Sequence, residues 1–197
     1  MLKRAFDLLF SFIGLIILFP FILLISIIII IDSKGWAFYL QKRVGKNNKD
    51  FYLFKFRTML KESDKKGLLT IGERDNRITR FGSVLRKYKL DELPQLLNVL
   101  SGNMSFVGPR PEVRKYVKMY NEEQLKVLTV KPGITDVASI VFRHENDILS
   151  KYKDPEDGYI QEVMPAKIKL NLHYLNNRSF VKDLGVILKT ISKIFNL

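Results

Sequence analysis

The sequence predicts a mainly helical α+β fold with small β elements, preceded by a membrane helix. Residues 8–31 carry no charge and consist almost wholly of Leu, Ile and Phe. Apolar residues within 93–100 and 180–195 recur at the spacing of one helix face. Alternation typical of a strand is short and lies at 51–59. We therefore expect a membrane segment at 1–33 and one compact domain at 34–197.

The charge balance indicates an anionic partner. The 197-residue chain carries 33 Lys and Arg against 20 acidic residues, a net charge of +13. Nucleic acid, an acidic membrane surface and a phosphorylated substrate all fit this balance. The chain has no cysteine, which excludes disulfides, thiolate chemistry and Cys-based zinc sites. The two histidines, His144 and His173, are far apart and argue against a His-rich metal site.

The apolar run at 8–31 is long enough to cross a bilayer as a helix, at about 1.5 Å per residue. It is too long for a cleaved signal peptide, and no small-residue cleavage site follows it. It is also apolar all round, which argues against a core helix of a soluble protein.

The topology of this run stays open from the residues alone. Pro20 lies near its middle, where it removes a backbone hydrogen bond and kinks a helix. Basic residues flank the run on both sides, so the positive-inside rule gives no orientation: Lys3, Arg4, Lys34, Lys42 and Arg43. A spanning helix and a re-entrant hairpin with both ends cytoplasmic both fit.

Residues 51–86 predict a strand, a polar loop and a helix in turn. Lys55 and Arg57 lie in the strand pattern at 51–59, where solvated basic side chains on an exposed face are the ordinary explanation. The polar stretch 61–77 reads as a surface loop over a site. A short helix at 78–86 then has Thr79 or Ser83 as its candidate cap.

The adjacent carboxylates Asp91 and Glu92 are the centre of the candidate site. Pro94 and the leucines after it predict a helix, which would put the pair at a helix N-terminus. Capping alone would explain an isolated pair. Here Arg86 precedes it, and Arg110 follows between two prolines that stiffen its backbone. Such a guanidinium either pairs with the carboxylates or helps to hold a phosphate, and carboxylates beside a phosphate usually require Mg²⁺.

The C-terminal part is predicted to be mostly helical. We expect helices at 112–127, 165–175 and 180–195, with an acidic, turn-rich loop at 154–158. The apolar side of the last helix fits either core packing or a membrane surface, and we expect packing.

Several motifs together resemble the bacterial sugar transferases, the small monotopic phosphoglycosyl transferases that act on polyprenyl phosphate. They are Leu90-Asp-Glu-Leu-Pro-Gln95, Asn98-Val-Leu100, Gly102, Met104-Ser105, Val107-Gly-Pro-Arg-Pro111, Gln41-Lys-Arg-Val-Gly45, Lys55-Phe-Arg-Thr-Met59 and Pro132-Gly-Ile-Thr135. The resemblance covers nearly the whole chain.

The resemblance implies that a sugar 1-phosphate passes from a UDP-sugar to polyprenyl phosphate and that UMP leaves. It implies Asp91 as nucleophile, Glu92 as its partner, Mg²⁺ held by this pair, and a covalent phosphosugar intermediate. Further residues would contact phosphate or nucleotide: Lys55, Arg57, Arg86, Arg110 and Arg143. It also implies a re-entrant helix broken at Pro20 and a catalytic domain on the cytoplasmic face of the bacterial inner membrane.

The sequence departs from the family pattern at three places. Phe19 stands where a Ser often precedes the proline, and Asp136 and Ser139 replace residues of the usual Gly-x-Ala-Gln continuation. Arg143 falls near a family arginine, but its neighbours do not match. We expect the departures around 134–145 to affect donor selectivity.

The alternative function is a non-catalytic, membrane-anchored binder of acidic lipid or nucleic acid. A binder would not need Asp91 and Glu92 among its cations, because carboxylates repel phosphate unless a metal intervenes. We therefore expect membrane lipid, the UDP-sugar and polyprenyl phosphate as partners and no nucleic acid. A homo-oligomer stays open.

Overall fold

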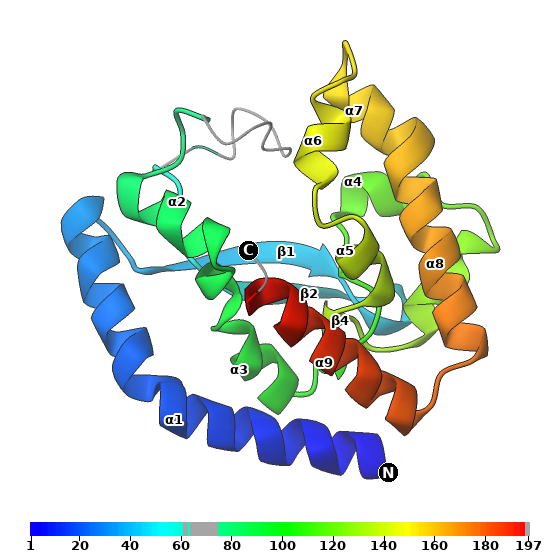
Figure 1. The fold of residues 1–197 in the computed structure, drawn as a ribbon, viewed down its shortest axis with the longest axis horizontal. Coiled ribbons are helices and arrows are strands. Elements are labelled where there is room, and N and C mark those ends of the chain that lie inside the picture. The colour runs from blue at the N-terminus through cyan, green and yellow to red at the C-terminus, as the bar shows by residue number, and fades with distance from the viewer. Residues whose placement is uncertain (61–62, 64–74, 196–197) are drawn as a thin grey trace.

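The computed structural model describes residues 1–60, 63 and 75–195, and it confirms a mainly helical fold with small β elements (Figure 1). Most of the predicted polar loop at 61–77 lies outside these residues. The α-helices of the described residues are α1 (Leu2–Asp32), α2 (Arg80–Lys87), α3 (Gln95–Leu100), α4 (Arg114–Val117), α5 (Val137–Val141), α6 (Glu145–Leu149), α7 (Pro155–Gly158), α8 (Met164–Asn176) and α9 (Phe180–Phe195).

Two short pairs of strands contain or adjoin several of the motifs of the sequence. Strands β1 (Phe38–Val44) and β2 (Asp50–Phe56) form an antiparallel hairpin in which Tyr39 pairs with Lys55. Strands β3 (Ser105–Val107) and β4 (Gly133–Thr135) are parallel. Strand β2 confirms the predicted strand, whereas β1 was not predicted.

The first end of α1 is bonded to the domain. The Lys3 ammonium donates to the Val107 carbonyl at 2.8 Å and to the Asp183 carboxylate at 2.6 Å. Arg4 donates to the Val99 and Leu100 carbonyls. The helix therefore begins against α9 and the C-terminal end of α3.

The second end of α1 is bonded to the same domain. The Phe81 amide of α2 donates to the Asp32 carboxylate at 3.2 Å, and Arg57 donates to Ser33. Ile25 and Ile29 are buried against Phe56 and Leu85. Figure 1 shows that α1 runs along one side of the domain and bends part-way, and Pro20 lies inside the helix.

Between its two attached ends, α1 exposes a broad apolar surface. Large side chains there are between 40% and 63% exposed: Phe10, Phe12, Ile13, Ile16, Ile17, Phe19, Phe21, Leu23 and Leu24. Soluble monomers rarely expose so large an apolar patch to water, so we expect lipid or another protein to cover this surface.

Thr79, one of the two candidate caps, caps helix α2, which begins at Arg80 rather than at residue 78. The Thr79 hydroxyl accepts from the Gly82 amide at 2.9 Å, which satisfies one free donor of the first turn. Gly82 packs directly on the backbone of Thr58, so a Cβ added there would lie 2.2 Å from the Thr58 carbonyl oxygen. This close approach lets Arg86, one turn on, donate from Nε to the Thr58 hydroxyl at 2.9 Å.

We expect Gly82→Ala to lower stability by about 1–3 kcal/mol, because the backbone of α2 must move away from Thr58. Gly185→Ala in α9 is the matched control, since a Cβ there meets nothing within 4 Å. That change should be neutral or stabilising by up to about 1 kcal/mol, since it removes a glycine from a helix interior. Thermal unfolding of both variants measures the difference, and equal midpoints would contradict the packing argument.

The prediction of one helix at 112–127 is wrong. Helix α4 spans four residues, and a separate 3₁₀ turn, η4 (Gln124–Thr129), follows. Asn121 and Gln124 exchange side-chain-to-backbone hydrogen bonds at 2.9 and 3.0 Å. This reciprocal cap starts a new turn and thereby prevents the continuation of α4.

The other C-terminal predictions fare better. Helices α8 and α9 match the expected 165–175 and 180–195 within a residue. The expected loop at 154–158 is instead the one-turn helix α7, which Asp154 caps. Val186 of α9 is buried with Val107 and Tyr174, as core packing requires, although Val181 and Leu188 stay exposed.

Candidate active site

The carboxylate pair lies in a short 3₁₀ turn, η3 (Leu90–Glu92), directly before α3. Lys89 starts this turn in the left-handed region, with φ 57°. Pro94 then occupies the N-cap position of α3. The pair therefore precedes the predicted helix by a few residues, and it does not form the first turn of α3.

Asn98 fixes α3 against β2 and so sets the distance between the pair and Lys55. Its side-chain amide donates to the Tyr52 carbonyl at 2.7 Å and accepts from the Phe54 amide at 2.9 Å. Asn98 is fully buried, and these bonds satisfy both ends of its side chain. Lys55 is the next residue of β2, which places its side chain beside η3.

Glu92 is held by two cations. The Arg110 guanidinium forms a fork, with Nη1 3.2 Å from one carboxylate oxygen and Nη2 bonded to the other. The Lys55 ammonium lies 3.6 Å from Glu92 Oε1. Burial opposes the ionised form of Glu92, but Arg110 and then Lys55 outweigh it and hold its pKa well below the usual range. The two cations therefore favour the ionised form of Glu92.

Asp91 has the opposite environment. Asp91 as a whole residue is only 8% exposed. Among the residues that the structure describes, no hydrogen bond or ion pair reaches its carboxylate. Burial first, and then the charge of Glu92, raise the pKa of Asp91. A more basic and unpaired carboxylate is the better nucleophile of the two.

The backbone of Arg110 is held by Asp136. The Asp136 carboxylate accepts from the Arg110 amide at 2.7 Å, and its other oxygen accepts from the Ser139 amide to cap α5. Asp136 is 1% exposed. Sequence reasoning connected Asp136 with selectivity and missed this positioning role, because the two residues are 26 positions apart.

The remaining basic candidates differ in place. Arg86 donates to the Thr58 hydroxyl. Burial lowers the pKa of Arg86, and the negative charge of Asp91 opposes this effect. Arg57 bonds to Ser33 at the end of α1. Arg143 lies between α5 and α6. Within the described ranges, neither Arg57 nor Arg143 forms a hydrogen bond or ion pair with the carboxylate pair.

Burial lowers the pKa of Lys55 to about 8, although Glu92 opposes this effect. The neighbouring Arg43 also lies close and contributes to the positive field, but its own bonds go to the Pro111 carbonyl, Glu112 and Gln41. Arg43 was not among the predicted site residues. Its place in the Gln41-to-Gly45 motif was the available signal.

The donor set fits Mg²⁺. Within residues 1–60, 63 and 75–195, no cluster of three or more His, Asp or Glu side chains could hold a metal on its own. Mg²⁺ commonly takes one or two carboxylates and completes its shell with water and phosphate oxygens. Asp91 has unused lone pairs, and Glu92 retains some beyond its bonds to Arg110.

A profile of the bacterial sugar transferases matches residues 1–197. The chain belongs to the bacterial sugar transferase family. This membership confirms the resemblance inferred from the motifs.

Relatives in this family have named activities. The chain is 35% identical, over 98% of its length, to the UDP-N-acetylgalactosamine-undecaprenyl-phosphate N-acetylgalactosaminephosphotransferase of Aeromonas hydrophila. It is 33% identical, over 99% of its length, to the UDP-glucose:undecaprenyl-phosphate glucose-1-phosphate transferase of Escherichia coli (strain K12). The chain spans only 43% and 40% of those two bacterial sugar transferases. It spans 87% of the uncharacterized sugar transferase EpsL of Bacillus subtilis (strain 168), to which it is 38% identical.

Proposed function

We propose that this protein transfers a sugar 1-phosphate from a UDP-sugar to undecaprenyl phosphate, releases UMP and so initiates a cell-surface glycan. The contrast between an unpaired, basic Asp91 and a Glu92 clamped by Arg110 carries the proposal. The named activities of the family relatives support it. A protein that only binds acidic lipid or nucleic acid would not require a carboxylate pair among its cations, because carboxylates repel phosphate.

The first step is attack by an Asp91 carboxylate oxygen on the sugar-bearing phosphorus of the donor. A new P–O bond forms, and the bond from this phosphorus to the bridging oxygen breaks, so UMP leaves with that oxygen. Arg110 and Lys55 offset the negative charge of the diphosphate that Asp91 must approach. Bound Mg²⁺, held by Asp91 and Glu92, would supply further charge neutralisation.

The second step transfers the phosphosugar to the lipid. An oxygen of undecaprenyl phosphate attacks the same phosphorus, and the Asp91–phosphorus bond breaks to regenerate the carboxylate. Two steps suit substrates from different phases, because the soluble donor and the lipid acceptor can occupy the site in turn.

The topology proposed for the protein is re-entrant, with α1 dipping into the cytoplasmic face of the inner membrane. Both ends of α1 bond to one domain, at Lys3 and at Asp32, while its middle is apolar and exposed. A domain cannot hold both ends of a spanning helix from one side of the bilayer. A bend at Pro20 would return the chain to the same face. Residues 34–197 would then form the cytoplasmic domain.

Cysteine labelling tests this topology in a chain without native cysteines. Leu2→Cys and Trp36→Cys replace exposed side chains on either side of the membrane segment. We expect an impermeant thiol reagent to label both from the cytoplasmic side of inside-out vesicles and neither from the periplasmic side. Phe19→Cys is the control: it is exposed in the fold, so protection of this site would come from lipid. Labelling of the two ends from opposite sides would establish a spanning helix.

The transferase is tested with purified protein in nanodiscs, undecaprenyl phosphate and a panel of UDP-sugars. We expect Mg²⁺-dependent release of UMP and a lipid-linked sugar diphosphate from at least one donor. If no donor in the panel turned over, the membrane-anchored binder would be favoured instead.

A further inference from the structure

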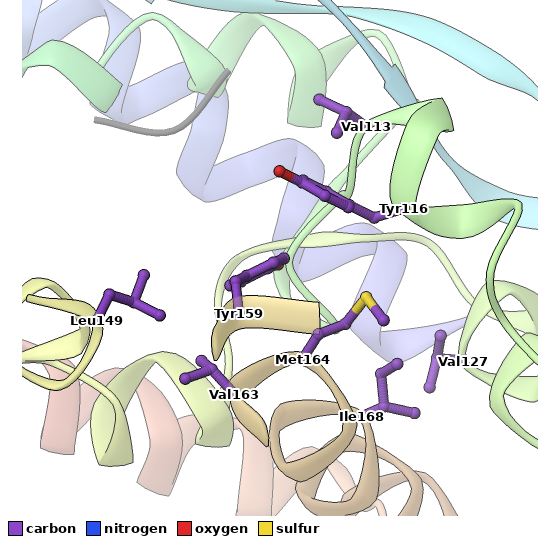
Figure 2. Packing of buried hydrophobic residues seen from close by; sticks show 8 residues of the cluster. All are labelled: Val113, Tyr116, Val127, Leu149, Tyr159, Val163, Met164 and Ile168. Carbon is purple, nitrogen blue, oxygen red and sulfur yellow. The ribbon is translucent and has the colours of Figure 1, made fainter. Parts of the chain in front are cut away.

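A cavity of about 180 Å³ adjoins the candidate site and extends to α8. Arg110, which clamps Glu92, forms part of its wall. Figure 2 shows the apolar and aromatic part of that wall, which comprises Val113, Tyr116, Val127, Tyr159, Met164 and Ile168. A space of this size holds several water molecules and can therefore admit a small polar ligand.

The polar part of the wall contains an unsatisfied group. Asn171 of α8 is 6% exposed, and its Oδ1 has no hydrogen-bond partner among the described residues. The Tyr120 hydroxyl likewise has no hydrogen bond within the part of the chain that the structure describes. A buried carbonyl without a partner costs stability, so a structural role alone does not explain Asn171.

The other polar groups of the wall are rich in acceptors. Glu145 accepts from Lys167 at 2.7 Å, and Glu112 accepts from Arg43 at 3.2 Å and from the Tyr159 hydroxyl. Each carboxylate keeps lone pairs beyond these bonds. Such a wall suits a ligand with several hydroxyl donors.

The sugar and the uracil, at the two ends of the donor nucleotide, differ in the number of hydrogen-bond donors that they offer. A hexose offers hydroxyl donors around its ring, and its C–H faces pack on aromatic side chains such as Tyr116 and Tyr159. Uracil offers one N–H donor between two carbonyl oxygens, which the carboxylates of Glu112 and Glu145 would repel. The cavity chemistry therefore favours the sugar over the base.

We infer that this cavity receives the sugar of the nucleotide donor, and that Asn171 and Tyr120 are specificity-determining residues. The inference rests on the proposed function, because it assigns part of the proposed donor to a place. It follows from the position of Arg110: a diphosphate held there, within reach of Asp91, lies at the edge of the cavity.

The test compares binding of UDP-sugars with binding of UDP, which has the same diphosphate and base but no sugar. Calorimetry uses the full chain in nanodiscs with Asp91→Asn, so that no turnover occurs, and the probes are UDP-glucose, UDP-galactose and their N-acetylhexosamine counterparts. Asn171→Leu and Tyr120→Phe are the two pocket variants. Asn176→Leu is the matched control, because Asn176 lies on the exposed face of α8.

We expect each pocket variant to weaken the preferred UDP-sugar about tenfold or more and to change UDP affinity less than twofold. Asn176→Leu should change neither. Equal weakening of UDP and UDP-sugar would mean that the cavity holds the nucleotide, and unchanged binding of both would mean that it holds neither; each result overturns the inference. The thermal midpoint of Asn171→Leu is measured to check that this variant folds. Tyr120→Phe removes only one oxygen atom and tests the pocket independently if Asn171→Leu does not fold.

These failures are distinct from failure of the proposed function. UMP release by the chain with Asp91 intact is measured in parallel with the same donors. Release from a donor, together with unchanged binding by the pocket variants, would overturn only the cavity assignment. Release from none of the donors would overturn both.

Discussion

Asp91→Asn should abolish the covalent phosphosugar adduct and lower turnover by at least about 10³-fold, because the amide is not a nucleophile. With the unaltered protein, mixing a UDP-sugar and Mg²⁺ without lipid should release up to one equivalent of UMP per enzyme. The peptide that contains Asp91 should then be heavier by one sugar phosphate. Ping-pong kinetics should follow when both substrates are present.

The structure offers a control for this experiment. Asp147 is an exposed aspartate of α6, and its only ion pair within the described ranges is with His144, so Asp147→Asn should leave the burst and the adduct unchanged. If Asp91→Asn still formed the adduct on this peptide, Asp91 would not be the nucleophile. If UMP appeared only after lipid was added, direct transfer in one step would replace the two-step mechanism.

Local patterns predicted the elements that depend on local forces. The helices α8 and α9 follow the spacing of apolar residues, and Thr79 caps α2 as its hydroxyl chemistry suggests. Strand β1 was not predicted. The alternation of residues typical of a strand is clearer in its partner β2, and the composition of one strand does not reveal that it pairs with another across a hairpin.

In the candidate site, too, sequence motifs predicted some features, whereas contacts between distant segments were not predictable. The motifs predicted that Asp91, Glu92, Lys55 and Arg110 belong together, and the fold brings both Lys55 and Arg110 into contact with Glu92. The bond from Arg110 to Asp136 was not predictable, because it requires the parallel pairing of β3 and β4.

That pairing is possible only because of two glycines. A Cβ on Gly108 would lie 2.4 Å from the Lys131 carbonyl, and one on Gly133 would lie 2.2 Å from the Gly108 amide nitrogen. The glycines of the Gly-Pro-Arg-Pro and Pro-Gly-Ile-Thr motifs thus let the two backbones meet. Sequence order gives no indication that these motifs are neighbours in space.

Arg110→Lys should lower kcat/KM tenfold or more, which corresponds to a loss of about 1.4 kcal/mol in transition-state stabilisation. Arg110 binds both oxygens of Glu92 through two nitrogens of one planar group. A lysine ammonium is a point charge and cannot make this fork, so Glu92 would lose its fixed orientation. The positive charge stays, and the effect therefore isolates geometry from charge.

Arg114→Lys is the matched control for this substitution. Arg114 also uses several guanidinium nitrogens, but its partners are Asp50 and Asn48, and these contacts are exposed. Exposed ion pairs contribute little to stability, and Arg114 forms no hydrogen bond or ion pair with the carboxylate pair within the described residues. We therefore expect kcat/KM within twofold of the unaltered protein for Arg114→Lys. Near-normal activity in Arg110→Lys, measured with the same donor and lipid, would remove the Arg110 fork from the catalytic site and leave Lys55 as the cation that matters to Glu92.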